Sequence, residues 1–372
     1  MQTIRKIAIN TGGGDAPGLN AVIRAAVLSA INRGWEVYGI RRGYAGLLGE
    51  ESITPLTRES VRGITHVGGT ILGTTNRGNP FAWPVAGRGA NGRTVDRSDE
   101  VIAAFDEHGF DALIAVGGDG SLRIAEELAR KGLPVVGVPK TIDNDIAGTA
   151  LTFGFLTAVE TATEAIDKLH STAEAHERVM IVEVMGRHAG WIALFSGVAG
   201  TADVILIPEI PYCLDPVCEK IQERERLGRR FSIVVCAEGA RAREGEPVFR
   251  DPEHARLGGI GDLLAAQIAE RTGKETRALA LGHLQRGGSP NAYDRLIALR
   301  FGAAAVHCVK QGCFGCMVAL ESPDVRAIPL ADAVRRRKLV PVEGDVVKTA
   351  RALGISFGDC NRRTAAARES GT

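Results

Sequence analysis

The 372-residue sequence has almost no excess of charge of either sign and no long apolar run. Its 45 basic and 44 acidic side chains leave a net charge of +1, so no overall field draws the protein toward nucleic acid or a membrane surface. No apolar run approaches the length that spans a membrane, and the start, MQTIRKIAIN, has no signal-peptide pattern. Anion binding must therefore be local, and we expect a cytoplasmic protein.

Cysteine is also sparse: seven residues are scattered along the chain and predict neither a disulfide framework nor a zinc site. Cys313 and Cys316 form one Cys-x-x-Cys pair, but no second pair or histidine partner stands nearby at suitable spacing. We interpret both as reduced thiols, as expected in a reducing cytoplasm.

What the sequence does have is a regular alternation of short apolar runs and helical patterns. Residues 6–10, 112–116 and 135–138 are predicted as buried strands, and apolar side chains recur at helical spacing over 19–31. A long amphipathic helix starts near residue 155, and three more strands are predicted after it, at residues 179–184, 204–207 and 233–237. The alternation predicts an α/β protein with two Rossmann-like lobes, each a mostly parallel sheet flanked by helices.

Three loops that directly follow predicted strands contain glycine or aspartate, and ligands of open α/β sheets bind at such strand ends. The first loop, residues 11–18, has three successive glycines whose amides can point at an anion, although such a turn can also be purely architectural. No Gly-Lys-Ser/Thr follows, so it is not a Walker loop. The second loop, residues 117–121, places Asp119 where it can hold a cation or cap a helix.

The third loop, residues 139–145, carries two carboxylates beside a lysine. Asp143 and Asp145 stand two positions apart after a strand, with Lys140 just before them. An aspartate here can accept the proton of an attacking hydroxyl during phosphoryl transfer, and a solvated acidic turn is the alternative. Further along, residues 185–190 and 282–290 flank arginine with glycine, which suits forked contacts with phosphate oxygens. Together these segments predict a pocket for several phosphates.

Six segments resemble those of phosphofructokinases and occur in the same order: TGGGDAPGLN, GGTILGTTNRGNPF, GGDGS, PKTIDND, EVMGRHAGW and GHLQRGGSP. The resemblance covers about residues 6–300. It implies an active site in the cleft between the lobes. We expect a donor-binding lobe at 1–153 plus about 284–335, a sugar-phosphate lobe at 154–283 plus about 336–360, and a polar tail at 361–372.

The resemblance also implies roles for individual residues. Asp143 matches the general base that takes the proton of the sugar's 1-hydroxyl, and Asp119 matches the residue that places Mg²⁺. The other positions matching catalytic groups are Gly13, Arg77, Lys140 and Thr141. Those matching the donor site are Gly13, Tyr44, Arg77, Gly118, Asp119, Gly120 and Ser121. Those matching fructose 6-phosphate contacts are Thr141, Asp143, Asp145, Met185, Gly186, Arg187, Glu238, His283 and Arg286. Arg178 and Arg277 match arginines that reach the 6-phosphate from a neighbouring subunit, so a homotetramer or homodimer with shared sites is expected.

The phosphoryl donor is either ATP or pyrophosphate in this family. Gly120 is typical of ATP users, because an aspartate there would place a side chain and a charge where the α-phosphate lies. Lys140 is typical of pyrophosphate users but adds only a cation. We therefore predict ATP with Mg²⁺, with pyrophosphate as the alternative.

Two rival functions remain. The Gly-Gly-Asp-Gly-Ser segment also resembles that of NAD and lipid kinases, but these lack the Thr-Ile-Asp-Asn-Asp loop. A non-catalytic regulatory subunit that binds sugar phosphates would be expected to have lost its base or metal residue, yet Asp119, Asp143 and Arg187 are all present.

Overall fold

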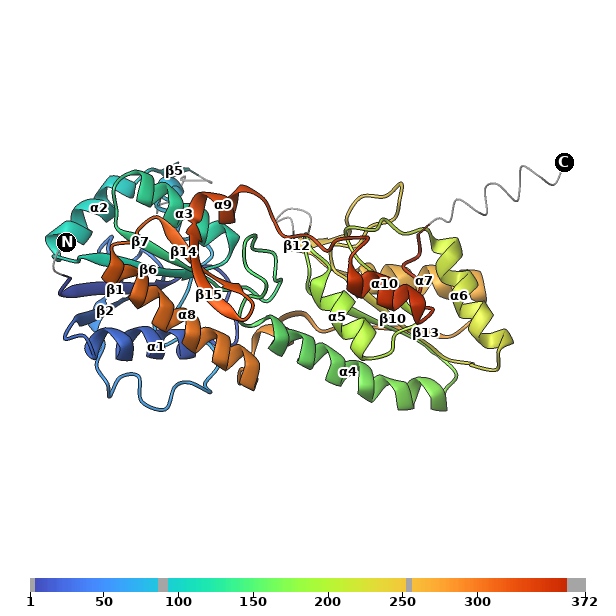
Figure 1. The fold of residues 1–372 in the computed structure, drawn as a ribbon. Coiled ribbons are helices and arrows are strands. Elements are labelled where there is room, and N and C mark those ends of the chain that lie inside the picture. The colour runs from blue at the N-terminus through green and yellow to red at the C-terminus, as the bar shows by residue number, and fades with distance from the viewer. Residues whose placement is uncertain (1–3, 86–92, 252–255, 360–372) are drawn as a thin grey trace. The chain divides into compact units, whose positions relative to one another are not determined.

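The computed structural model describes residues 4–85, 93–251 and 256–359. The predicted tail at 361–372 lies outside the described residues. The chain divides into two compact units: unit 1 comprises residues 1–157 and 286–338, and unit 2 comprises residues 158–285 and 339–372. Each unit is built on one mainly parallel sheet, which confirms the predicted α/β class (Figure 1).

Unit 1 contains a seven-stranded sheet in the order β15-β14-β7-β6-β1-β2-β3. The five inner strands are parallel, and the two edge strands, β3 and β15, are antiparallel to their neighbours. The strands are β1 (Lys6–Thr11), β2 (Glu36–Ile40), β3 (Ile53–Pro55), β6 (Ala112–Gly117), β7 (Val135–Pro139), β14 (Cys316–Glu321) and β15 (Asp324–Pro329).

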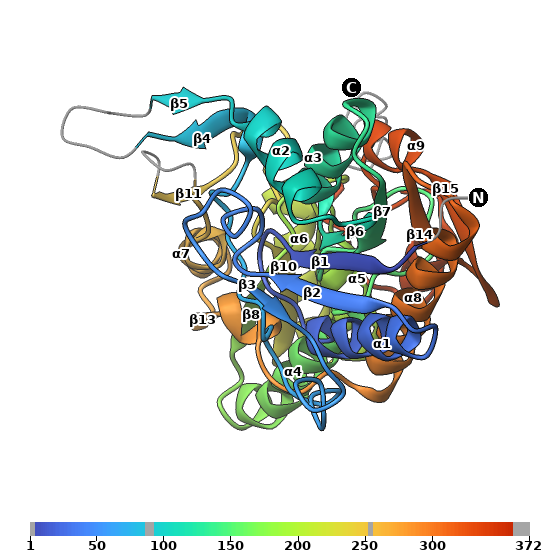
Figure 2. The ribbon, with the colours of Figure 1, turned by 90° about the vertical axis from the view of Figure 1, so that its left-hand side faces the viewer.

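Helices cover both faces of this sheet (Figure 2). A hydrophobic core lies on each face of the sheet, and alternate side chains of β1 point into one or the other. Ile7 and Ile9 pack toward α1 (Leu19–Ile31) and α8 (Ala292–Gln311). Ala8 packs toward the other face, covered by α2 (Ser98–Glu107), α3 (Asp119–Arg130) and α9 (Leu330–Arg335). A short 3-10 helix, Pro80–Ala82, precedes a small hairpin of β4 (Trp83–Pro84) and β5 (Thr94–Val95).

The register of the central strands brings the three predicted loops to one edge of the sheet. Thr11 of β1 lies opposite Val116 of β6, and Gly117 of β6 lies opposite Pro139 of β7. The segments that follow these strands therefore start side by side. Two backbone hydrogen bonds join them, from Gly12 N to Val116 O at 2.9 Å and from Lys140 N to Gly117 O at 2.9 Å.

Unit 2 contains a four-stranded parallel sheet in the order β13-β8-β10-β9. Its strands are β8 (Val179–Val184), β9 (Val204–Leu206), β10 (Ser232–Ala237) and β13 (Thr276–Ala280). One face packs on α6 (Leu214–Arg226) and α7 (Ile260–Thr272), and α5 (Trp191–Ala199) packs on the other. The remaining elements are α4 (Phe155–Ala175), which begins in unit 1, α10 (Asp345–Ala352), the β11 (Phe249–Asp251) and β12 (Arg256–Leu257) hairpin, and the 3-10 helix Gly282–Arg286.

Cys313 and Cys316 are free thiols, as predicted, and so are Cys218, Cys236 and Cys308. Cys213 is disulfide-bonded, which the scattered spacing of the cysteines did not predict. Within the described ranges, no helix is both long and apolar enough to cross a membrane.

Candidate active site

The glycine loop after β1 leaves space beside two side chains of the neighbouring loops. Gly13 has a left-handed φ of 77°. A Cβ at this position would lie 3.3 Å from Ser121 Oγ and 3.7 Å from Lys140 Nζ. Two of the amides expected to face an anion are engaged within the protein, because Gly12 N donates to Val116 O and Gly13 N donates to Thr75 O. The lack of a side chain at Gly13 therefore lets a bound group come close to Ser121 and Lys140. The amides of Gly12 and Gly13 are not available as donors to that group.

Two cations lie against the carbonyls of this glycine loop. Lys140 Nζ donates to Gly14 O, and Arg286 Nη1 donates to Asp15 O at 3.0 Å. Lys140 is buried, and the pKa of its ammonium is lowered to about 8. Burial is the main cause of this shift, the positive charge of Arg286 adds to it, and the carboxylates of Asp15, Asp143 and Asp145 oppose it. Both cations therefore lie beside the glycine loop that follows β1.

Asp143 is the carboxylate that stands beside these cations. Its Oδ1 atom is shielded from solvent and has no hydrogen-bond partner within the described residues. Burial raises the pKa of Asp143, and the charges of Arg286 and Lys140 oppose the rise. The Asp143 amide donates to Thr141 Oγ1 at 3.1 Å, which fixes the start of the loop. A shielded carboxylate oxygen without a partner is free to accept a proton from a bound hydroxyl.

Asp145 and Asp119 form the acidic side of the site. The pKa of Asp145 is raised to about 6, mainly by burial and also by the negative charges of Asp143 and Asp119. Asp119 starts α3 and pairs with Arg123 at 3.1 Å and with Arg337 at 3.3 Å. In the described part of the chain, no three His, Cys, Asp or Glu residues could hold a metal by themselves. One or two carboxylates are nevertheless the protein ligands that Mg²⁺ uses when phosphates supply the rest, so this pair fits that ion.

The donor-side residues are divided between open and buried positions. A Cβ at Gly120 would meet no atom within 4 Å, whereas one at Gly118 would lie 3.3 Å from Lys140 O. The position of Gly120 is therefore open. Tyr44 is 4% exposed and packs in the core cluster with α2 and α3, so its predicted donor contact stays a prediction.

Arg77 is exposed and lines a pocket of about 280 Å³ in unit 1, together with Arg42, Glu50 and Trp83. Trp83 Nε1 donates to Glu50 Oε1 at 2.9 Å. The sequence motifs did not single out Glu50 or Trp83. These residues stand outside the Gly- and Asp-bearing loops, so no local pattern marks them.

In unit 2, most of the predicted sugar-phosphate residues follow the carboxyl ends of strands. Met185, Gly186 and Arg187 follow β8, and Glu238 follows β10, where its amide donates to Val184 O at 2.8 Å. His283 follows β13, in the 3-10 helix. Gly186 has a φ of 140°, and a Cβ there would lie 2.8 Å from Ala189 O. Arg187 and His283 are exposed at this edge.

Arg178 and Arg277 lie at the opposite end of the same strands. Arg178 immediately precedes β8, and Arg277 is the second residue of β13. Both pair with Glu275 Oε1, at 2.8 Å and 2.7 Å. Six residues of β8 separate Arg178 from Met185, a length of roughly 20 Å. Within one copy of unit 2, the two arginines are therefore brought together with each other but not with Arg187 and Glu238.

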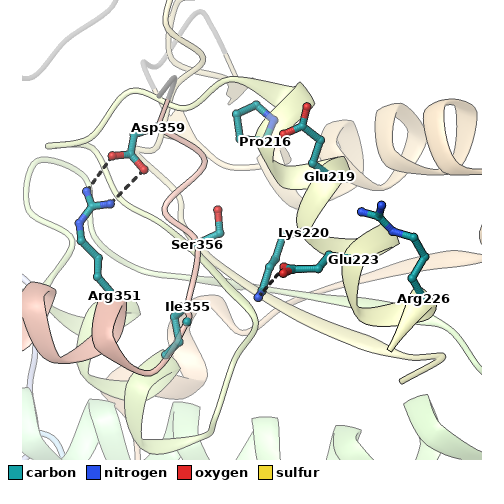
Figure 3. Close-up of a pocket in the computed structure, with 10 residues that line it drawn as sticks. Pro216, Glu219, Lys220, Glu223, Arg226, Arg351, Ile355, Ser356 and Asp359 are labelled. Atoms are coloured by element: carbon teal, nitrogen blue, oxygen red, sulfur yellow. Dashed lines mark hydrogen bonds and ion pairs between the residues drawn. The ribbon is translucent and has the colours of Figure 1, made fainter. Parts of the chain in front are cut away.

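A further cavity in unit 2, of about 520 Å³, contains none of the predicted site residues (Figure 3). It lies between α6 and the segment from Arg351 of α10 to Asp359, and two ion pairs join charged side chains of its lining. Arg351 contacts Asp359 through two hydrogen bonds of 3.2 Å and 2.8 Å, and Lys220 pairs with Glu223 at 3.0 Å. Because the cations of both pairs already have partners, we assign no ligand to this cavity.

The sequence and the structure are both similar to those of phosphofructokinases. The Phosphofructokinase family model matches residues 6–309. An ATP-dependent 6-phosphofructokinase of Chloroflexus aurantiacus is 53% identical over 355 residues, which are 95% of this chain and 98% of that protein. A pyrophosphate–fructose 6-phosphate 1-phosphotransferase of Amycolatopsis methanolica is 50% identical over 345 residues, 91% of this chain and 97% of that one. A crystal structure of Pichia pastoris phosphofructokinase in the T-state superposes with a TM-score of 0.77 at 31% identity. That match covers 99% of this chain but only 39% of the longer yeast chain.

Proposed function

Because the chain belongs to the phosphofructokinase family, we propose that it transfers the γ-phosphoryl group of ATP to the 1-hydroxyl of fructose 6-phosphate, giving fructose 1,6-bisphosphate and ADP. One observation carries the proposal. The shielded Oδ1 of Asp143 has no hydrogen-bond partner within the described residues and stands beside the cations Lys140 and Arg286. This arrangement suits proton removal from a hydroxyl and stabilisation of a phosphoryl group at the same place. We expect the enzyme to act in the cytoplasm.

The reaction has one proton to move and one bond to exchange. Asp143 accepts the proton of the 1-hydroxyl while the hydroxyl oxygen attacks the γ-phosphorus, and the bond to the ADP oxygen breaks. Lys140 and Arg286 stabilise the negative charge on the transferring group, with Arg77 and the backbone of Gly13 as further contacts. Thr141 holds the amide of Asp143 and so limits the positions of its carboxylate.

Mg²⁺ is the metal that the acidic side of the site would hold. Asp119 and Asp145 are its proposed ligands, since their charges act on one another and the donor phosphates would complete the coordination. When bound, the ion supplies positive charge to the donor phosphates. In this structure, the Asp119 carboxylate pairs with Arg123 and Arg337.

The choice of ATP rests on Gly120, and pyrophosphate is the second candidate donor. The open space beside Gly120 suits a nucleotide's phosphates, with Gly118 and Ser121 next to it. Lys140 favours the alternative, because lysine at this position is typical of the family's pyrophosphate users. The relative from Amycolatopsis methanolica is named as a pyrophosphate enzyme. The relative from Chloroflexus aurantiacus, at 53% identity, is named as ATP-dependent.

For the sugar phosphate we propose Met185, Gly186, Arg187, Glu238 and His283 of one subunit, together with Arg286. The two arginines at the amino ends of β8 and β13, Arg178 and Arg277, would serve the 6-phosphate of a neighbouring subunit. Their distance along the strands from Arg187 supports this proposal, and it requires a homodimer or homotetramer.

A donor comparison tests the function. Purified protein is assayed with fructose 6-phosphate and Mg²⁺, using ATP or pyrophosphate, and fructose 1,6-bisphosphate is measured. We expect ATP to support turnover and pyrophosphate to do so poorly. A preference for pyrophosphate would replace the first candidate donor by the second. If neither donor gave product, both candidate reactions would be contradicted, and a non-catalytic sugar-phosphate-binding subunit would be favoured.

A further inference from the structure

The last two residues of unit 1 cross the loop that carries Asp143 and Asp145. Arg337 forms an antiparallel bridge with Ile146, and Lys338 N donates to Asp145 O at 2.8 Å. Arg337 and Lys338 are hereafter called the strap. The strap is joined to the third loop, which lies about 190 residues earlier in the sequence.

The ammonium group of Lys338 is held by three oxygens of this loop region. Nζ donates to Asn144 Oδ1 at 2.8 Å, to Thr149 O at 2.9 Å and to Ala150 O at 2.9 Å. An ammonium group has three donors, so each of them has an acceptor here. Shielding of the group by protein lowers the pKa of Lys338 to about 8, and the charge of Asp145 opposes this shift.

Asn144 is the residue through which this contact reaches the two acids. It lies between Asp143 and Asp145, is 2% exposed and has a left-handed φ of 51°. Asparagine adopts this conformation more readily than most residues, at some cost in energy. Its Oδ1 also accepts from Thr152 N at 3.1 Å, and Thr152 Oγ1 donates to Thr141 O at 2.7 Å. The turn is thus held from both of its ends.

We propose that Lys338 is a positioning residue for phosphoryl transfer, which holds the left-handed turn at Asn144 and thereby sets the directions of the Asp143 and Asp145 carboxylates. The inference rests on the proposed function. Because Asn144 is the only residue between the two acids, a change in its backbone angles rotates one carboxylate relative to the other. A displacement of about 1 Å at a reacting group can lower a rate by about a hundredfold, so a small rotation has a large effect.

Lys338→Met tests the proposal, because it keeps much of the chain length and removes the three donors. We expect kcat to fall about 10- to 100-fold, while KM for ATP and for fructose 6-phosphate changes less than about threefold. Amide hydrogen exchange should become faster in residues 141–150. Lys310→Met, the same substitution at an exposed lysine of α8, should match wild type in all these values.

A double-mutant cycle identifies the route of the effect. Asn144→Gly keeps the left-handed conformation accessible but removes the acceptor of Lys338, so its kcat should fall similarly. If Lys338 acts through Asn144, the double variant should be no slower than the slower single variant. Multiplication of the two losses would overturn the proposed route.

A purely structural role predicts a different set of results. Phe105→Leu, in the core below α2, lowers stability without removing a contact of Lys338, and it shows what a lower melting temperature alone does to kcat. A Lys338→Met protein that melts earlier but keeps kcat within twofold of wild type would overturn the proposal. If wild-type protein gave no product with either donor, the proposed function would fail, and unchanged amide exchange at residues 141–150 in Lys338→Met would separately refute the positioning role.

Discussion

Asp143 is subject to opposing influences: burial raises its pKa, and the neighbouring cations Arg286 and Lys140 lower it. Burial favours the protonated form of the carboxyl group, and the two neighbouring cations favour the ionised form that can accept a proton. Asp143→Asn keeps the shape and removes the proton acceptor. We expect kcat to fall by about two to four powers of ten, with KM for fructose 6-phosphate changed far less. Steady-state kinetics of the purified variant measure both values, and near-normal turnover would contradict the assignment of the base.

Lys140 provides a second prediction at this scale, for the pH dependence of the free enzyme. Its pKa is lowered to about 8, so the ammonium loses its proton as the pH rises through this value. We expect kcat/KM for ATP to decline above about pH 8. In Lys140→Arg the guanidinium stays charged, so the decline should move to higher pH even if the maximum value is lower. A pH profile from 6 to 10 measures the shift, and an unchanged alkaline limb in the variant would show that another group titrates there.

The third prediction at this scale concerns Gly120 and the choice between ATP and pyrophosphate as donor. A side chain at this position meets no protein atom within 4 Å of its Cβ, so Gly120→Asp should fold normally and project a carboxylate into open space. We expect KM for ATP to rise at least tenfold, because the new charge repels a phosphate of the nucleotide. The use of pyrophosphate, tested in parallel, should be affected less. Unaltered ATP kinetics in a folded variant would remove Gly120 from the donor site.

At the scale of elements, the start of α4 is fixed by a residue from α8. Asp294 is fully buried and its Oδ2 accepts from Thr157 N at 2.7 Å and from Thr157 Oγ1 at 2.6 Å. Asp294→Asn replaces one carboxylate oxygen, which accepts hydrogen bonds, with an amide NH₂ group, which donates them. We expect the free energy of unfolding to fall by about 1–3 kcal/mol. Urea unfolding measures the change, with Asp106→Asn on the exposed side of α2 as the control. Equal stability of the two variants would show that the cap contributes little.

The elements themselves were largely predictable from sequence, because they follow from local periodicity. The helix predicted over 19–31 is confirmed as α1, and the strands predicted at 179–184 and 233–237 are confirmed as β8 and β10. Parallel pairing then places the loops after β1, β6 and β7 at one edge, where the Gly- and Asp-bearing motifs stand. The family's motifs supplied the individual roles, which remain predictions.

Contacts between distant parts of the chain were not predictable in the same way. Lys338 ends the run Arg335-Arg336-Arg337-Lys338, which alone suggests a solvated basic surface, yet its ammonium group contacts Asn144. Likewise, the glycines of residues 12–14 suggested three amides facing an anion, but two of these donate to Val116 O and Thr75 O. Tertiary partners decide both cases, and no local pattern encodes them.

At the scale of the whole molecule, the positions of Arg178 and Arg277 bear on assembly. Both lie at the amino ends of unit 2 strands and share Glu275, whereas Arg187 and Glu238 follow the carboxyl ends. If both groups bind fructose 6-phosphate, they belong to different subunits, and each active site needs a second copy of the chain. The exposed Arg277 side chain is the better one to change, because its removal leaves the Arg178–Glu275 pair in place.

Arg277→Ala should raise KM for fructose 6-phosphate at least tenfold and leave KM for ATP almost unchanged, because only the 6-phosphate loses a charged partner. Mixing this variant with the inactive Asp143→Asn protein, under conditions that allow subunit exchange, should restore part of the activity at low fructose 6-phosphate. A hybrid contains sites in which a complete Asp143 from one subunit meets a complete Arg277 from the other. Each variant mixed with itself is the control, and light scattering gives the oligomeric state. A strictly monomeric protein with full activity would rule out the shared site, because no second subunit would then be present to supply Arg277.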